Sequence, residues 1–263
     1  MAVVVTRSVV GAIDPVLLAF LRFLIASLLL SPALFVGARE KLRAKDLAAV
    51  ACLGIIFFGL FQWLFNASLA LIPASRGALW IATMPLLTFG LAGLLRIEPF
   101  TRPKLLGTVL TAIGIALALG DPGTLADSSS FRGDLLMFAT ACCGATYFVL
   151  SRPLLKRLPA LQVTSISMIS GTAFLGCLSA ANGAIGIPNL SPSGWMAVAF
   201  LGTVPGAIGF GLWVWALRHS TPTRTAVFAA LNPISATLLG VLLLGEPLPA
   251  KFLLGFAIVL GGS

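Results

Sequence analysis

The sequence predicts an all-α integral membrane protein with ten transmembrane helices, arranged as two inverted five-helix repeats. Three observations predict this fold: the composition, the succession of apolar spans and an internal repeat. Hydrophobic residues make up 59% of the 263 residues and charged residues only 10%, whereas a soluble domain carries about 25% charged residues. Because no soluble fold could bury this much apolar surface, lipid has to solvate most of it.

Apolar spans follow one another along the whole chain, separated by charged or proline- and glycine-containing breaks. Most are near the roughly 20 residues that a helix needs to cross a bilayer. They should be helices, because open strands cannot satisfy their backbone polar groups in lipid. The first and last spans are too short, so we expect the chain to lack the start of its first helix and the end of its tenth. The spans are 1–11, 16–37, 47–71, 75–95, 104–120, 133–151, 161–181, 195–217, 223–244 and 250–263.

An internal repeat relates the two halves of the chain. Residues 51–114 align without a gap with residues 199–262, at an offset of 148 (199 minus 51). Chance agreement between apolar segments does not explain identical charged, proline and glycine residues at matching positions, so the pattern indicates duplication of a five-helix unit. The identical pairs include Gly54/Gly202, Arg76/Arg224, Pro85/Pro233, Glu98/Glu246 and Pro99/Pro247.

The odd number of helices in each copy predicts the topology. The second copy enters the membrane from the opposite side, so a pseudo-twofold axis in the membrane plane should relate the halves. We place the first repeat at 1–120, a polar linker at 121–132 and the second repeat at 133–263. Most lysines and arginines fall in the loops that join helices 2–3, 4–5, 6–7 and 8–9, which predicts that these loops and both termini are cytoplasmic.

Three stretches resemble a known family. ALWIATMPLLTFGLAGLLRIEP (78–99) matches AVFAALNPISATLLGVLLLGEP (226–247), and IDPVLLAFLRFLIASLLL (13–30) carries a proline followed seven residues later by Arg22. These stretches resemble the EamA-like ten-helix carriers of the drug/metabolite transporter superfamily, and the chain is most similar to bacterial aromatic amino-acid exporters of the YddG type. Ile97 departs from the pattern, because it replaces the usual glycine before the glutamate.

The resemblance implies a transporter in the inner membrane of a bacterial cell. Its expected activity is the export of amino acids, aromatic and other neutral ones, and of related metabolites, by alternating access. We expect a monomer, because the internal repeat already supplies two opposed halves. The expected partners are a small-molecule substrate and membrane lipid.

Prolines inside two repeat-related spans predict where the binding site lies. Pro85 and Pro233 each remove a helical hydrogen bond and bend the helix. Inverted-repeat carriers place their site near the bilayer midplane beside interrupted helices, so we expect these helices to line a central cavity; a packing kink without a ligand role is the alternative. Pro205 and Gly206 are expected bending points.

Polar and aromatic side chains on the predicted inner faces are the candidate substrate-binding residues. Amides deep in a span rarely face lipid, because an unpaired polar group there costs several kcal/mol. They therefore point inward and either touch the substrate or hold helices together, and tryptophans there could stack on an aromatic substrate. The candidates are Gln62, Trp63, Asn66, Trp80, Thr83, Tyr147, Trp213, Phe228, Asn232 and Ser235.

The charges constrain the substrate. All eight acidic residues are expected at helix ends or in loops, so no buried carboxylate is available to exchange a proton for a cationic drug. An uncharged, aromatic-lined cavity suits a neutral or zwitterionic solute with an apolar side chain. Arg7 and Arg22 are the deepest positive charges, and they either snorkel as anchors or bind a phosphorylated solute.

Three functions compete on this sequence: the amino-acid exporter, the same fold carrying another metabolite, drug or phosphorylated solute, and an intramembrane enzyme. The enzyme needs a buried nucleophile with its base, or a metal cluster, and the spans contain neither pattern. The single histidine, His219, ends a span, and the four cysteines lack metal-type spacing. We therefore expect no enzyme activity, no metal, no cofactor and no nucleic-acid partner.

Overall fold

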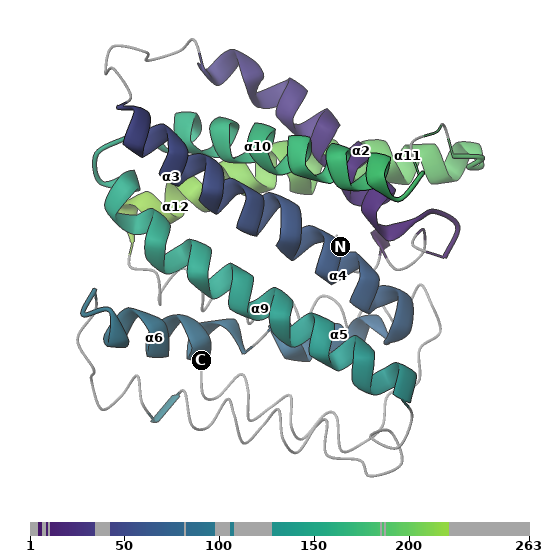
Figure 1. The fold of residues 1–263 in the computed structure, drawn as a ribbon, viewed down its shortest axis with the longest axis horizontal. Helices are drawn as coiled ribbons and strands as arrows, with labels where there is room; N and C mark the ends of the chain where they lie inside the picture. The colour runs from purple at the N-terminus through teal and green to yellow at the C-terminus, as the bar shows by residue number, and fades with distance from the viewer. Residues whose placement is uncertain are drawn as a thin grey trace.

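The computed structural model describes residues 5–6, 9, 11–34, 43–81, 83–97, 106–107, 128–184, 186 and 188–220. Every regular element among these residues is a helix (Figure 1). The elements are α2 (Pro15–Leu30), η1 (Ser31–Leu34), α3 (Ala44–Gly54), η2 (Ile55–Leu60), α4 (Phe61–Leu71), α5 (Ala74–Ile81), α6 (Met84–Leu94), α9 (Ser128–Leu155), α10 (Ala160–Ala181), α11 (Pro192–Leu201), η3 (Gly202–Gly209) and α12 (Phe210–His219).

Four described helices are long and apolar enough to cross a membrane. They are Ala44–Leu71, Ser130–Leu155, Ala160–Ala181 and Pro192–His219, and two shorter apolar helices are Pro15–Leu30 and Met84–Leu94. All six fall on predicted spans. The predicted spans 1–11, 104–120, 223–244 and 250–263 lie largely or wholly outside the described residues, so the count of ten helices and the inverted repeat stay predictions.

Local sequence sets where two of these helices begin. Asp14 caps α2 by accepting a hydrogen bond from the backbone N–H of Leu17 at 3.0 Å, and Pro15 occupies the first helical position. At the start of α11, Ser191 is the cap and accepts a hydrogen bond from the backbone N–H of Gly194, and Pro192 occupies the first helical position. A short polar cap satisfies an N–H group that has no partner within the helix, and a proline at the first position loses nothing by lacking its own N–H.

Two of the long helices widen in their middles into π-helical segments. η2 joins α3 to α4, and the backbone N–H of Phe61 donates to the carbonyl of Ile56, five residues earlier. η3 joins α11 to α12 and contains Pro205. At the offset of 148, residues 55–60 correspond to 203–208, so the two wide segments occupy matching positions of the internal repeat. Single π-helical turns are frequent at functional sites.

Two glycines allow close contact between helices beside these segments. A Cβ atom on Gly54 would lie 2.4 Å from the carbonyl oxygen of Ser167 in α10, and one on Gly202 would lie 2.8 Å from the carbonyl oxygen of Arg22 in α2. Ser170 reinforces the first contact, because its hydroxyl donates to the carbonyl of Ala51 at 3.1 Å. In lipid, helices gain little hydrophobic energy from packing together, so close contact at small residues and hydrogen bonds from hydroxyl groups hold them instead.

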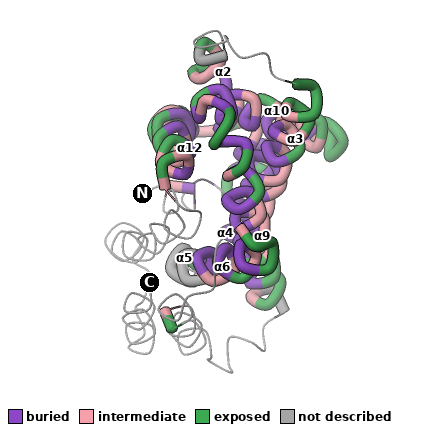
Figure 2. The backbone as a smooth tube through the Cα atoms, turned by 90° about the vertical axis from the view of Figure 1, so that its left-hand side faces the viewer, coloured by how far each residue is buried: buried purple, intermediate pink, exposed green. Residues whose placement is uncertain are grey.

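The helices form two groups that share the long α3–η2–α4 helix. α10 packs against α2, α3 and α12, whereas α9 packs against α4, α5 and α6. Figure 2 shows buried residues where these helices meet and exposed residues on their outward faces. Many exposed residues are large and apolar, as a lipid-facing surface requires. They include Leu28, Leu94, Met196, Ile208, Leu212 and Trp215.

Replacement of Gly54 by alanine should destabilise the protein. The added methyl group meets the α10 backbone, which cannot move aside locally, and overpacking of this kind costs about 1–3 kcal/mol. Gly90→Ala is the matched control, because a Cβ there meets nothing within 4 Å and alanine favours a helix over glycine. Thermal unfolding in detergent should show a lower Tm for Gly54→Ala only; equal Tm values would contradict the close contact.

Candidate functional site

An aromatic cluster fills the region between η2, α9 and the start of α12. The rings of Phe57 and Tyr147 stack with centroids 4.4 Å apart, and Phe58 contacts Phe210 at 5.2 Å. The aromatic cluster consists of Phe23, Phe57, Phe58, Tyr147, Phe148, Phe210 and Trp213. The two π-helical segments therefore bring aromatic side chains from both halves of the chain together.

Two members of the aromatic cluster carry buried polar atoms for which the described residues supply no hydrogen-bond partner of normal geometry. Tyr147 is fully buried, and its hydroxyl lies beside Ser167 without a hydrogen bond of normal geometry. The indole N–H of Trp213 also has no partner among the described residues, and its ring packs against Phe148 at 5.7 Å. Leaving such a group unsatisfied costs about 1–3 kcal/mol, so these two atoms mark the aromatic cluster as a candidate binding site.

The two amides of α4 point into the protein, which confirms the prediction for Gln62 and Asn66. Gln62 is 2% exposed and Asn66 is 1% exposed. Asn66 Nδ2 donates to the carbonyl of Pro15 at 3.0 Å and so joins α4 to α2. Among the described residues, Gln62 Nε2 and Asn66 Oδ1 have no partner. One donor and one acceptor therefore remain available beside the same pair of helices.

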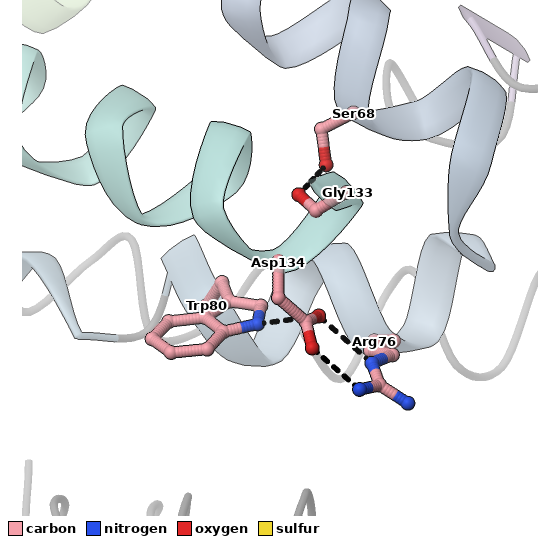
Figure 3. A network of polar contacts seen from close by, with 5 residues as sticks. All are labelled: Ser68, Arg76, Trp80, Gly133 and Asp134. Atoms are coloured by element: carbon pink, nitrogen blue, oxygen red, sulfur yellow. Dashed lines mark hydrogen bonds and ion pairs between the residues drawn. The ribbon is translucent and has the colours of Figure 1, made fainter. Parts of the chain in front are cut away.

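Trp80 lies in a polar network rather than in the aromatic cluster (Figure 3). Its indole N–H donates to Asp134 Oδ1 at 2.8 Å, and the guanidinium of Arg76 binds both oxygens of the same carboxylate. Nearby, the hydroxyl of Ser68 donates to the carbonyl of Gly133 at 2.7 Å. The network joins α4, α5 and α9 at one end of the bundle.

The burial of Asp134 corrects the expectation that every acidic residue lies at a helix end or in a loop. α9 begins at Ser128, before the predicted span, so Asp134 is more than a turn inside the helix and only 6% exposed. The polar run at residues 128–130 conceals this helical start, because hydropathy alone assigns such residues to a loop. Arg76 in the neighbouring span is the one signal in the sequence that could have identified a buried partner.

The remaining described candidates lie around the cluster or at helix breaks. Trp63 is half-buried and packs against the core. Thr83 is buried, and its hydroxyl donates to the carbonyl of Trp80 at 2.6 Å. α5 ends at Ile81 and α6 begins at Met84 with Pro85 in its first turn, so the expected interruption is present.

The other predicted hinge residues lie in η3 or outside the described residues. Pro205 is inside η3, and Gly206 packs closely on Ala26 of α2. Placement of the remaining candidates stays a prediction. Those outside the described residues are Phe228, Asn232, Pro233 and Ser235.

The described ranges contain no cluster of three or more His, Cys, Asp or Glu side chains with the geometry of a metal site. All four cysteines fall within these ranges and are free thiols. The candidate site thus consists of aromatic rings and amides, which are groups that line small-molecule sites in proteins.

Comparison with known proteins identifies the class and then the family. The apolar helices, packed around a polar and aromatic centre, define a multi-pass membrane protein. The model of the EamA-like transporter family matches residues 1–120 and 131–263. The chain belongs to this family, within the drug/metabolite transporter superfamily, and is a membrane transporter.

Relatives along the whole chain agree with this assignment. The uncharacterized transporter YyaM of Bacillus subtilis is 28% identical over 258 residues, which cover 96% of this chain and 84% of that protein. A probable terminal-alkyne amino-acid exporter of Streptantibioticus cattleyicolor is 28% identical over 246 residues, 93% of this chain and 81% of that protein. These relatives are transporters, consistent with the expectation that this chain is not an enzyme.

A solved crystal structure shares the fold. It is 23% identical in sequence, with a TM-score of 0.74, and the match covers 99% of this chain and 92% of that one.

The Asp134→Asn variant should lose much more stability than Asp46→Asn. The first leaves Arg76 without a charged partner in a largely buried place, and removing one partner of a buried pair costs about 3–5 kcal/mol. Asp46 pairs with the exposed Arg157 at 2.9 Å, and exposed pairs contribute about 0–1 kcal/mol. Thermal unfolding of both variants measures the difference.

The double variant Arg76→Asp with Asp134→Arg controls for effects unrelated to the pair. It should recover part of the Tm that Asp134→Asn loses. If Asp134→Asn and Asp46→Asn lower the Tm equally, or if the double variant recovers none of the lost Tm, the pair of Arg76 and Asp134 does not hold α5 to α9.

Proposed function

We propose that the chain exports amino acids, aromatic and other neutral ones above all, together with related metabolites, across the inner membrane of a bacterial cell. The aromatic cluster with its unpartnered Tyr147 hydroxyl and Trp213 indole N–H is the observation that supports this most directly. Aromatic rings suit an apolar side chain, and the buried polar atoms suit a polar group carried with it. One relative is a probable exporter of a terminal-alkyne amino acid.

We infer that transport proceeds by alternating access around this cluster. The close contacts at Gly54 and Gly202 hold α3 to α10 and η3 to α2. η2 and η3 lie directly beside these contacts, and π-helical segments and proline are known points of helix bending. Rocking of the two repeats would then open the cluster to each side in turn. Pro85, Pro205, Gly206 and Pro233 are the proposed hinges.

Contacts at one end of the bundle support a proposed orientation in the membrane. Arg157 in the α9–α10 turn pairs with Asp46 at the start of α3, and Arg152 donates to the last carbonyls of α12, those of Leu217 and Arg218. The start of α3, the α9–α10 turn and the end of α12, which border predicted basic loops, therefore meet at one end. We propose that this end and both termini are cytoplasmic.

The proposed substrate is not a cationic drug. Asp134 is the buried acidic residue of the described chain, and Arg76 neutralises it. We infer that the cluster offers no free carboxylate to a cation, and that downhill facilitated export is as compatible with the site as ion-coupled export. Transport of a phosphorylated solute is the second candidate, and the buried Arg22 is the observation that favours it.

Uptake into proteoliposomes tests the proposed function. Labelled tryptophan and threonine should enter vesicles containing the full chain, and excess unlabelled aromatic amino acids should block tryptophan uptake. An imposed pH gradient should leave the final amount of tryptophan in the vesicles unchanged if transport is facilitated. The gradient should raise this amount if transport is coupled to protons. Uptake of neither amino acid would contradict the proposal.

Replacement of Trp213 by leucine should reduce tryptophan uptake by about two- to tenfold. The variant loses a ring of the cluster and an indole N–H, and an aromatic pair contributes about 0.5–1.5 kcal/mol beyond its buried area. Trp215→Leu is the matched control on the same helix, because Trp215 is 56% exposed on the outward face. Gel filtration should show both variants folded, and similar uptake by the two would remove Trp213 from the site.

A further inference from the structure

Arg22 is buried inside the protein, which corrects the expectation that it snorkels to the membrane surface as an anchor. It is the eighth residue of α2, and it is 4% exposed. Its guanidinium carbon lies 5.0 Å from the ring centroid of Phe23, a member of the aromatic cluster. Its Nε has no hydrogen-bond partner among the described residues. A buried charge is costly unless it is paired.

None of the acidic residues in the described part of the chain pairs with Arg22. The described acids are engaged elsewhere: Asp14 caps α2, Asp46 pairs with Arg157, and Asp134 pairs with Arg76. The other five acids of the sequence fall outside the predicted apolar spans and outside the described residues; they are Glu40, Glu98, Asp121, Asp127 and Glu246. The described residues therefore supply no carboxylate as counter-charge for the guanidinium of Arg22, and a ligand could supply one.

Helix geometry places Arg22 about one turn from the level of Gln62 and about two turns from the level of Asn66. α2 contacts the α3–η2–α4 helix at two points: Pro15 meets Asn66, and Phe23 meets Phe58. A step of eight residues forward along α2 therefore matches a step of eight residues backward along the other helix. The two helices are antiparallel. Arg22 follows Pro15 by seven residues and so shares its face, and helical side chains point back toward the N-terminus. The guanidinium therefore extends toward the turn that carries Gln62.

We propose that Arg22 binds the carboxylate of an amino-acid substrate, with Gln62 Nε2 as a second donor and Asn66 Oδ1 as the acceptor for the ammonium group. The apolar side chain of the substrate then enters the aromatic cluster. A guanidinium forms paired hydrogen bonds with a carboxylate, and charge-assisted bonds of this kind are about twice as strong as neutral ones. The proposal rests on the proposed amino-acid export and adds the part of the substrate that the site recognises.

Thermal stabilisation of the purified full chain by three probes tests the assignment. The probes are L-phenylalanine, L-phenylalaninamide, which lacks the carboxylate, and phenyl phosphate. L-Phenylalanine should raise the Tm of the unmutated protein in a concentration-dependent manner, and the amide should need at least tenfold more ligand for the same shift. Arg22→Gln should lose this preference for the acid, whereas Arg132→Gln, a change of an exposed arginine in α9, should keep it.

Arg22→Lys provides a second variant if Arg22→Gln does not fold. Lysine keeps the charge but loses the paired donors, so the preference for the acid should shrink without disappearing. If L-phenylalanine raises the Tm of Arg22→Gln as much as it raises the Tm of the unmutated protein, Arg22 does not bind the carboxylate. The proposed amino-acid transport would then still stand. Stabilisation by phenyl phosphate alone, or by none of the probes, would overturn the carboxylate site and the amino-acid function together.

Discussion

The close contact of helix backbones at Gly54 and Gly202 is the constraint on which the rest of the structure depends. In lipid, helices gain little hydrophobic energy from meeting each other, so close packing and hydroxyl hydrogen bonds have to hold them. Gly54 brings α3 onto α10, and Gly202 brings α11 onto α2. η2 and η3 begin at these contacts, and Phe57 and Phe58 of η2 meet Phe210, the residue that follows η3.

The polar groups differ in how they are satisfied. Two ion pairs, Arg76 with Asp134 and Arg157 with Asp46, lie toward the ends of the bundle. Among the described residues, buried polar atoms without a hydrogen-bond partner include those of Arg22, Gln62 and Tyr147. Buried polar groups are normally paired, so the unpaired ones beside the aromatic cluster support the proposed binding site there. The family to which the chain belongs transports solutes, which agrees with this arrangement.

Hydropathy and length predicted the described spans correctly, and the proline rule predicted the interruption at Pro85. A side-chain amide without hydrogen bonds is unfavourable in lipid, and this rule predicted correctly that Gln62 and Asn66 are buried inside the protein. Features that depend on tertiary packing were not predictable. Phenylalanines occur on lipid-facing and buried surfaces alike, so Phe57 carried no signal, and the bond from Trp80 to Asp134 requires α5 to lie against α9.

Substrate protection of Cys143 tests the central claim, that the aromatic cluster is the site that opens during transport. Cys143 lies one turn before Tyr147 on α9 and packs at the edge of the buried core, whereas Cys52 and Cys177 are on outward faces. Labelling by a small water-soluble thiol reagent can be followed at each cysteine by peptide mass spectrometry. The account predicts that tryptophan slows labelling of Cys143 and leaves Cys52 and Cys177 unchanged. Equal labelling of Cys143 with and without tryptophan would contradict it.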